Sequence, residues 1–380
     1  MATVNQVYSL LNSVQQMAYG EISIAIKDTA GLVSLGALVM SSDTNKDNFV
    51  HVLFDRIGMT LVDRRLYNAD DNNLIKRDFD YGVIMQKIHI EPCEAEENPE
   101  WLIGENDFTP VYAPVIKPVV KQKIFENMAT YETGVTIPDN MLKTAFTNEV
   151  DFSAFLVAIQ TALANGLELA KERAVDLTRA TMIASILKKG GAQAINLLKL
   201  FNDKLPTGET AYTVEQYLDD TKSLCDGAMQ IELTADRFKR ANKVFNEDEF
   251  ARFTPSDLIN LDILNVFDKA IKYKVRPVTF NENFVQLPNY RTVPYWEGAG
   301  TDYSFDEISK VAVHNLAEQS GIIGVMYDVE TAGVNIFGEE SAFDRNERAH
   351  YTTHYRQMTA QYYYDSSEQA VVFYLAEESE

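Results

Sequence analysis

Few side chains in this sequence combine a type and a spacing that suggest chemistry. His350 and His354 have the i, i+4 spacing of two zinc ligands on one face of a helix. The glutamate that should follow the first histidine in that motif is absent, and the segment reads as a loop that leads into a strand. We therefore expect no metal site here.

The remaining candidates are weaker. Ser185 and Lys188 have a serine–lysine spacing, but they fall at the end of a predicted helix. Cys93 and Cys225 lie far apart, which fits neither a disulfide framework nor a metal site, and nothing supplies a base that would make Cys225 a nucleophile. Gly298–Gly300 lacks the strand and helix of a dinucleotide fingerprint, and no phosphate-binding loop is present. Three histidines are isolated and are expected to have packing roles: His51, His89 and His314. The sequence predicts no catalytic residue, no cofactor and no enzyme.

The composition limits the partners. The 380 residues include 34 basic and 56 acidic side chains, a formal net charge of −22, and 46% hydrophobic residues. Such a chain can bury a core of two or three structural units. Binding to nucleic acid or to an anionic membrane through a basic patch is not expected, because neutralising phosphates needs clustered Lys and Arg. We find no secretory signal and no run of eighteen apolar residues, so we expect a soluble chain.

The most prominent element is a long helix predicted over 151–189, about 55 Å at 1.5 Å per residue. Asp151 is its predicted N-cap, and Lys188, Lys189 and Gly190 predict its end. Gly166 leaves open a pair of helices with a kink. The stripe of apolar residues is Phe152, Phe155, Leu156, Ile159, Leu163, Leu167, Ala170, Ala174, Leu177, Ile183 and Ile186.

The residues before this helix predict an amphipathic helix over 1–20, then an extended arm or an ordinary surface strand and loop over 21–50. A short helix at 49–58, a strand at 59–66 and a polar loop at 68–73 follow. Strands at 81–90 and 111–125, separated by an acidic, proline-broken tip at 91–110, predict a long projecting hairpin. A lone hairpin is marginally stable in water, so this one should need a neighbour.

The residues after the helix predict a mixed α/β region over 192–330. The predicted helices are Ala192–Phe201, Thr213–Asp226, Ala235–Phe245, Ser256–Lys272 and Phe305–Gln319. The predicted strands are Met229–Leu233, Val275–Phe280 and Gly321–Asp328. Two last strands, His354–Tyr364 and Ala370–Leu375, flank a polar turn and predict a hairpin.

Two blocks carry a resemblance to a known family. They are Leu53-Phe54-Asp55-Arg56-Ile57-Gly58 before the hairpin and Thr136-Ile137-Pro138-Asp139-Asn140-Met141-Leu142-Lys143-Thr144-Ala145-Phe146 before the long helix. Together with the order of the parts, they resemble the major capsid proteins of tailed bacteriophages, with small short-tailed podoviruses closest. The resemblance covers about residues 45–190 well and the rest more loosely, and 192–320 could not be matched residue by residue.

This resemblance implies an α+β protein with the Hong Kong 97-like capsid fold. The implied parts are an N-terminal arm at 1–48; a peripheral domain at 49–58, 134–191 and 331–380 with the spine helix at 151–189; an extended loop at 59–133; and an axial domain at 192–330. The last hairpin should rejoin the peripheral sheet. No lysine–asparagine cross-link is assigned.

The implied function is that of a major capsid protein, which self-assembles into the icosahedral head around phage double-stranded DNA. The implied partners are copies of itself in pentamers and hexamers, scaffolding and portal proteins, and enclosed DNA bound without sequence specificity; no membrane is expected. The location would be the virion, after assembly in the host bacterial cytoplasm. We further expect Lys117, Lys121 and Lys123 to meet acidic surface on an adjacent subunit. An encapsulin-like cargo shell, or an acidic soluble enzyme, remains as an alternative.

Overall fold

The computed structural model describes residues 4–20, 24–42, 44–45, 48–49, 52, 74–76, 85–90, 120–145, 149–275, 290–314 and 317–377. Most of the predicted helix at 49–58, the strand at 59–66, the loop at 68–73 and the tip at 91–110 lie outside these residues. The chain divides into two compact units. Unit 1 comprises Met1–Asn72, Met128–Ala174 and Asn335–Gln361; unit 2 comprises Asn73–Asn127, Val175–Val334 and Tyr362–Glu380.

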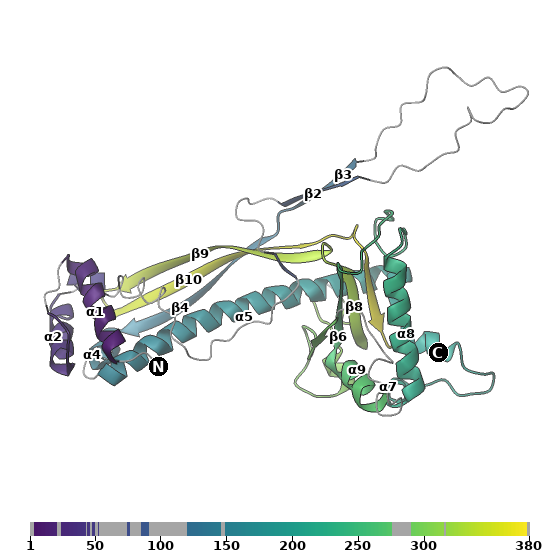
Figure 1. The fold of residues 1–380 in the computed structure, drawn as a ribbon, viewed down its shortest axis with the longest axis horizontal. Helices are drawn as coiled ribbons and strands as arrows, with labels where there is room; N and C mark the ends of the chain where they lie inside the picture. Colours follow the sequence, from purple (N-terminus) through teal and green to yellow (C-terminus); the bar gives the residue numbers. More distant parts are fainter. Residues whose placement is uncertain are drawn as a thin grey trace, which may run out of the picture. The chain divides into compact units, whose positions relative to one another are not determined.

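Unit 1 begins with two helices, α1 (Val4–Tyr19) and α2 (Thr29–Val39) (Figure 1). The expected helix near the start is confirmed, whereas the expected arm over 21–50 is wrong where α2 lies. Asp28 caps α2 by accepting a hydrogen bond from the Gly31 amide at 2.8 Å. The apolar residues that favoured an extended segment are instead buried against α1 and α5. This core contains Tyr8, Leu11, Val14, Ile26, Leu32, Leu35, Val39, Phe49, Ile137, Phe155, Ile159 and Leu163.

β4 and most of β9 and β10 belong to unit 1 and lie in a sheet with the strand order β1–β9–β10–β4. Its strands are β1 (Ile75–Lys76), β4 (Met128–Pro138), β9 (Ala332–Asn346) and β10 (Tyr351–Tyr364). β4 and β10 are antiparallel, in register from Pro138↔Tyr351 to Met128↔Gln361. After β4 the chain forms the short helix α4 (Asp139–Ala145), which leads to the long helix.

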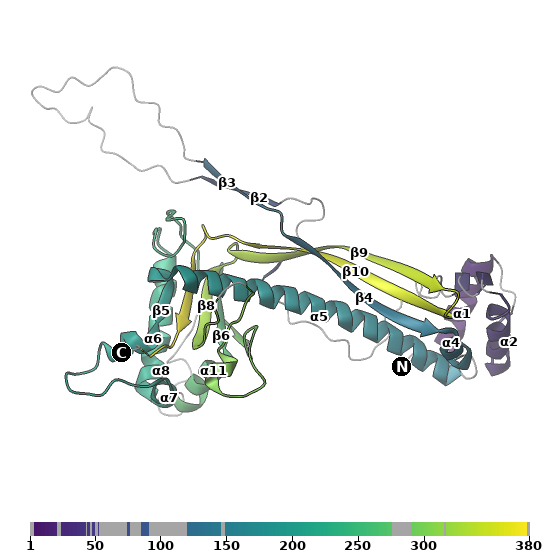
Figure 2. The same cartoon turned by 180° about the vertical axis from the view of Figure 1, so that it is seen from behind.

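The long helix α5 is a single helix, Glu149–Lys189, about 62 Å in length. The interpretation as two kinked helices is therefore excluded. Asp151 is not the N-cap, because the helix already includes Glu149. The predicted end is confirmed: Gly190 has a φ of +68°, and its amide donates to the Ile186 carbonyl at 2.8 Å. Figure 2 shows α5 running beside the strands of unit 1.

Gly166 lies where α5 meets β4. A Cβ at this position would lie 2.5 Å from Thr133 Oγ1 and 3.2 Å from Thr133 Cβ. Because Thr133 is β-branched and stiff, the contact cannot relax easily. The glycine therefore allows a close approach of helix and strand at the cost of about 1 kcal/mol in helix propensity.

This contact predicts that the effect of Gly166→Ala on the free energy of unfolding depends on the side chain at position 133. Gly166→Ala should lower the free energy of unfolding of the natural protein by about 1–3 kcal/mol, because overpacking outweighs propensity. In a Thr133→Ala background the same change should become neutral or raise it by up to about 1 kcal/mol. Urea denaturation of the four proteins measures both effects. An equal cost of Gly166→Ala in both backgrounds would show that Thr133 is not the reason for the glycine.

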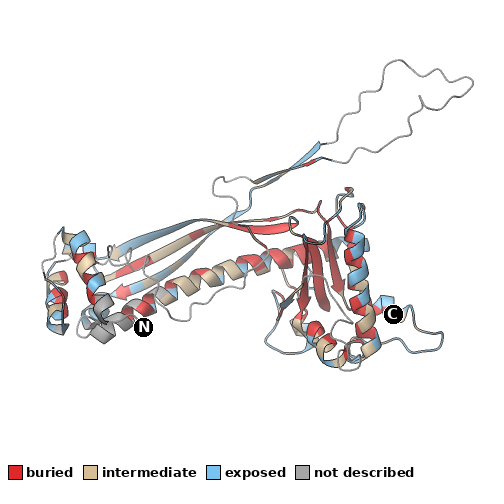
Figure 3. Ribbon diagram, in the orientation of Figure 1, coloured by how far each residue is buried: buried red, intermediate tan, exposed pale blue. Residues whose placement is uncertain are grey.

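Unit 2 is built on a sheet with the strand order β5–β11–β8–β6–β7, in which β8 is antiparallel to both neighbours. These strands are β5 (Ala194–Asn196), β6 (Ile259–Leu264), β7 (Tyr290–Val293), β8 (Ile322–Asp328) and β11 (Ala370–Tyr374). Figure 3 shows that its central strands are buried. The helices are α6 (Leu197–Asn202), α7 (Val214–Asp219), α8 (Thr221–Phe238), α9 (Asn265–Ala270) and α11 (Phe305–Ile308), with short 3₁₀ and π turns at Gly191–Gln193 and Ile271–Val275.

Several predictions for 192–330 are wrong. The strand at Met229–Leu233 is part of α8, whose apolar face packs on the sheet core. The helix at Ser256–Lys272 begins as strand β6, since six consecutive buried residues form the centre of the sheet. The helix at Phe305–Gln319 is helical only to Ile308. Val275 ends a π turn, and the rest of the strand predicted there lies outside the described residues.

The two C-terminal strands exist, but they do not form the predicted hairpin. β10 pairs with β4 in the first sheet, while β11 lies between β5 and β8 in the second. The expectation that both strands rejoin one sheet is wrong for β11. Local composition predicted the strands, but their pairing partners are far away in the sequence, as Gln361 is from Met128 and Val372 is from Ala194. Among the described helices, none combines the length and apolarity that crossing a membrane requires.

Candidate functional site

A two-stranded hairpin of unit 2, β2 (Met85–Ile90) and β3 (Val120–Phe125), has two chemically different faces. The strands are antiparallel, with His89 opposite Lys121 and Lys87 opposite Lys123. One face contains Met85, Lys87, His89, Lys121, Lys123 and Phe125. The other contains Gln86, Ile88, Ile90, Val120, Gln122 and Ile124. The strands and the alternation of β2 that the sequence predicted are confirmed for these residues.

The second face carries no charge and, apart from Gln86 and Gln122, is aliphatic, and its aliphatic side chains are exposed in the part of the chain that the structure describes. Ile88 is 58% exposed, Ile90 63%, Val120 54% and Ile124 53%. Four aliphatic side chains at such exposure on one short ribbon form a contiguous apolar surface, which is typical of an interaction site. We call Gln86, Ile88, Ile90, Val120, Gln122 and Ile124 the apolar hairpin face.

The first face of the hairpin contacts the rest of unit 2 through a cluster of charged side chains. Asp365, on the turn after β10, is fully buried and accepts from Lys87 Nζ at 3.1 Å and Lys123 Nζ at 3.0 Å. Lys87 also contacts Glu368 at 2.8 Å and Glu330 at 3.2 Å. We call Lys87, His89, Lys123, Arg252, Asp365, Ser367 and Glu368 the hairpin-base cluster.

The cluster keeps Asp365 ionised. Burial opposes the charged form, but hydrogen bonds from the Ser367 hydroxyl at 2.6 Å and amide at 3.0 Å, together with the Lys87 charge, outweigh it. These interactions hold the pKa of Asp365 well below its usual range. Burial also opposes the charge on Lys87, yet the adjacent Glu368 raises the pKa of this lysine.

The partners of the basic strand differ from the expected ones. Lys123 contacts Asp248 at 2.5 Å as well as Asp365, and Lys121 lies 3.9 Å from the centre of the Phe250 ring. Lys117 lies outside the described residues. Acidic surface for Lys121 and Lys123 was expected on an adjacent subunit; for Lys123 it comes from the same chain.

His89 lies at the centre of the cluster and is 5% exposed. Its Nε2 is 3.1 Å from Asp365 Oδ2 and 2.9 Å from the Ser367 hydroxyl, and its Nδ1 contacts the Arg252 guanidinium. Because Arg252 can only donate, Nδ1 must accept, so the proton of the neutral ring is on Nε2 and is directed toward Asp365. Burial, and next the charge of Arg252, lower the pKa of His89.

The cluster does not have the geometry of a catalytic triad, although a serine, a histidine and an aspartate meet in it. Ser367 and Asp365 both contact the same ring nitrogen, whereas a triad uses one nitrogen for each. Both side chains are also fully buried, so no substrate reaches the hydroxyl.

The same cluster has the spacing of a metal site. Ligand atoms of His89, Asp365 and Glu368 lie within 4.8 Å of one another, the one such group among the described residues. Lys87 bridges both carboxylates, and Arg252 contacts the remaining ring nitrogen. The cationic side chains therefore stand where a metal would, and we assign the site to attachment of the hairpin.

The other residues singled out in the sequence are dispersed. His350 is at a turn with a φ of +52°, while His354 is buried on β10. The Ser185 hydroxyl donates to Glu247 at 3.2 Å. Burial, and next Asp220, raise the pKa of the partly buried Cys225 thiol, which lowers its reactivity.

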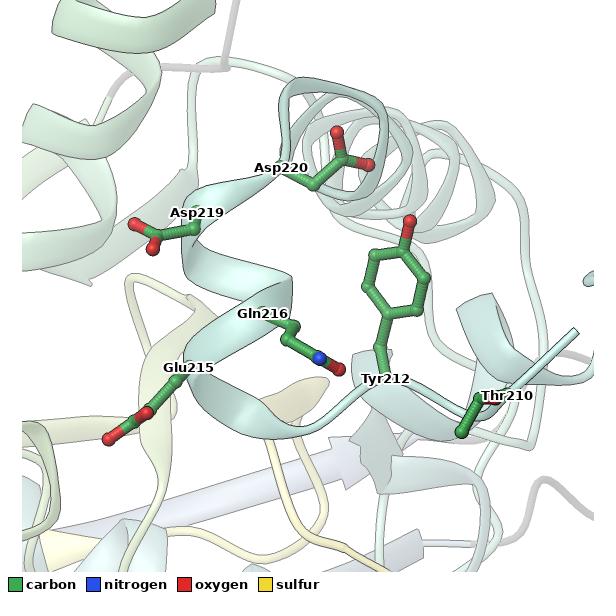
Figure 4. Close-up of a pocket in the computed structure, with 6 residues that line it drawn as sticks. All are labelled: Thr210, Tyr212, Glu215, Gln216, Asp219 and Asp220. Carbon is green, nitrogen blue, oxygen red and sulfur yellow. The ribbon is translucent and has the colours of Figure 1, made fainter.

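An open cavity of about 540 Å³ lies near the start of α7 and α8 (Figure 4). Its lining is polar and acidic: Thr210, Tyr212, Glu215, Gln216, Asp219 and Asp220. Two of these groups already have structural partners, since Gln216 completes the capping box with Thr213 and Asp219 binds Lys274. The cavity brings together no acid–base pair or nucleophile.

Solved structures from phages share this fold. The capsid structure of Staphylococcus phage Andhra is similar with a TM-score of 0.55 at 11% identity, over 84% of this chain and 87% of that one. A chain in the structure of head fiber and inner core protein gp22 of native bacteriophage P68 gives 0.50 at 10% identity, over 83% and 86%. At these identities the likeness shows the fold alone, a mixed helix-and-sheet phage capsid fold.

The sequence then identifies the family. Residues 11–374 match the profile of the Phi29-like phage major capsid proteins, and the chain belongs to this family. The major capsid protein of Bacillus phage GA-1 is 25% identical over 169 residues, which cover 44% of this chain and 34% of that protein. The chain thus matches about a third of the length of this relative. The resemblance drawn from the residues, including its podovirus character, is confirmed.

Proposed function

We propose that this chain is the shell subunit of a phage head, a structural protein of the virion. The single observation that carries the proposal is the match to the Phi29-like major capsid proteins over 364 of the 380 residues, 11–374. The structure adds physical support: unit 2 carries the apolar hairpin face, whose four aliphatic side chains are each more than half exposed among the described residues.

The net charge of the chain favours a second copy of this chain as the partner that covers the apolar hairpin face. Each copy carries a formal net charge of −22, so two copies repel where their acidic surfaces approach. The apolar hairpin face has no charged side chain, and the lysines of the hairpin lie on the opposite face. Contact through this face therefore buries apolar area with little electrostatic cost.

The assignment of parts rests on the resemblance. We propose that 1–48 acts as the arm, here partly helical, and that 59–133 is the extended loop that contains the hairpin. The peripheral domain, with its spine helix, would be made by 49–58, 134–191 and 331–380, and 192–330 would be the axial domain. The position of β11 in the sheet of unit 2 argues for adding 370–374 to the axial domain.

The partners follow from a role as shell subunit. We propose pentamers and hexamers of this chain, a scaffolding and a portal protein, and double-stranded DNA that the acidic wall encloses without sequence-specific contacts. Assembly would take place in the bacterial cytoplasm. The encapsulin-like alternative shares the implied fold, and the family match disfavours it.

Electron microscopy of the purified chain, with and without scaffolding protein from the same phage, tests the proposal. Closed icosahedral shells are the expected result. A chain that stays monomeric under both conditions, at concentrations where related capsid proteins assemble, would contradict it. Shells that are filled with a specific protein in cells lacking phage genes would favour the encapsulin-like alternative.

A further inference from the structure

Within the hairpin-base cluster, His89 is the side chain whose ordinary pKa, about 6.5, lies near neutral pH. His89 is buried between two kinds of partner, an acceptor at Nε2 and a donor at Nδ1. A neutral ring satisfies both at once, whereas an imidazolium donates from both nitrogens. The protonation state of His89 therefore decides whether the contact with Arg252 can exist.

We propose that His89 makes the attachment of the β2–β3 hairpin acid-sensitive: the neutral ring holds the hairpin on unit 2, and the imidazolium releases it. This inference concerns regulation of the surface that the proposed function uses, and it rests on that function only for its biological meaning. The hairpin carries the apolar hairpin face, so its release changes how that face is presented.

The charges around His89 come from five segments. β2 contributes Lys87, and β3 contributes Lys121 opposite His89 and Lys123 beside it. The segment 248–252 contributes Asp248, Arg252 and the Phe250 ring, whose centre is 6.1 Å from the imidazole. The segments that follow β8 and β10 contribute Glu330, Asp365 and Glu368.

The nearest carboxylates already serve other cations. Asp365 accepts from Lys87, Lys123 and Ser367, and Glu368 accepts from Lys87 at 2.8 Å and Arg252 at 3.5 Å. Glu368 Oε1 is 3.8 Å from His89 Nδ1, and a charged ring would compete there with the Lys87 and Arg252 donors that this oxygen already accepts. A charged ring thus adds a fourth cation to Lys87, Lys123 and Arg252 inside a buried site, which is unfavourable.

The pH window follows from the direction of the shift. Burial and Arg252 lower the pKa of His89 in the attached state, and the released ring regains an ordinary pKa of about 6.5. The released state therefore binds more protons, and attachment weakens as the pH falls below about 6.5. The lowered pKa of Asp365 keeps this carboxylate ionised in the same range, so its protonation does not produce the step.

Hydrogen exchange of the unassembled full chain tests the inference. The equilibrium constant for opening of the β2 and β3 amides should be larger at about pH 5.5 than at about pH 7.5, by a factor of at most about ten. This factor is the ratio that a released histidine of pKa about 6.5 gives. Exchange times are corrected for intrinsic pH dependence with an unstructured peptide of the same sequence. Equal protection at both pH values would overturn the inference.

Two variants assign the step to His89. In His89→Gln the amide oxygen can accept from Arg252 and the amide nitrogen can donate to Asp365, so the attachment should persist without the acid step. His350→Gln, at a histidine whose side chain is 72% exposed, should keep the step of the natural protein. An acid step that survives in His89→Gln would refute the role of His89.

A direct readout covers the case in which His89→Gln does not fold. NMR titration of the His89 ring in the natural protein should give a pKa below about 6.5, and a ring that titrates at or above this value would overturn the inference. All of these measurements use unassembled protein. A chain that shows the acid step but never forms shells would contradict the proposed function and leave this inference intact.

Discussion

Replacing Arg179 with alanine is expected to lower the free energy of unfolding of unit 2 by about 3–5 kcal/mol. Arg179 lies on α5 and is 2% exposed. Its Nε donates to Asp262 on β6 at 2.7 Å, and its Nη1 donates to Asp176 at 2.7 Å. Tyr327 on β8 also donates to Asp262, at 3.1 Å. Truncation removes the Arg179 guanidinium from the Asp262 carboxylate, which is 2% exposed.

The electrostatics agree with this expectation. Burial opposes the charge on Arg179, but Asp262 outweighs it and raises the pKa of the guanidinium. Because the cost arises from an orphaned charge, Arg179→Met combined with Asp262→Leu should recover much of the lost stability. Urea denaturation followed by circular dichroism measures the series.

Arg173, an exposed arginine on the same helix, is the matched control, and Arg173→Ala should change stability by less than about 0.5 kcal/mol. If Arg179→Ala is as mild as this control, the ion pair does not connect the helix to the sheet. If the double variant is no better than Arg179→Ala, the loss comes from packing and not from the uncompensated carboxylate.

The second large effect concerns assembly. Ile88→Glu combined with Ile124→Glu should reduce the yield of shells by more than tenfold while leaving the subunit folded. Both side chains are more than half exposed, so the single chain loses little by the change. A neighbour that covers them would lose about 1.5–3 kcal/mol for each isoleucine it buries and would have to desolvate two carboxylates. Negative-stain microscopy and sedimentation measure shells, and circular dichroism measures folding.

Two controls separate this contact from a general effect of charge. Tyr303→Glu adds the same charge at an aromatic residue that is 92% exposed, and it should assemble nearly as well as the natural chain. Ile88→Val with Ile124→Val keeps the face apolar and should also assemble. A normal yield of shells from the double glutamate variant would remove the apolar hairpin face from the subunit contacts.

Local patterns predicted the elements whose partners are close in sequence. The stripe of apolar residues and the Lys-Lys-Gly end predicted α5 almost to the residue, and alternation predicted which side chains of β2 share a face. Ser256–Lys272 failed because β6 is buried on both faces, and a strand without alternation resembles a buried helix. Capping by Asp28 was a local signal for α2 that the sequence did contain but that we did not use.

The candidate site was missed for a different reason. His89 was treated as isolated because Asp365 and Ser367 follow it by 276 and 278 residues, and no periodicity links such positions. Alternation did place Lys87 and His89 on one face, which indicated a charged face but not its partners. The apolar stripe of the long helix does not include Arg179, and only the position of Asp262 on β6 explains the burial of this arginine.

The position of β11 has a consequence for how the subunit is made. This strand, Ala370–Tyr374, is synthesised after every other described element, yet it lies inside the sheet between β5 and β8. Asp365, Ser367 and Glu368, which hold the hairpin, emerge from the ribosome just before it. Unit 2 therefore cannot complete its sheet until residues 370–374 have emerged from the ribosome. A chain synthesised only as far as β10 lacks the strand that completes the sheet of unit 2, so firm attachment of the hairpin has to wait for β11.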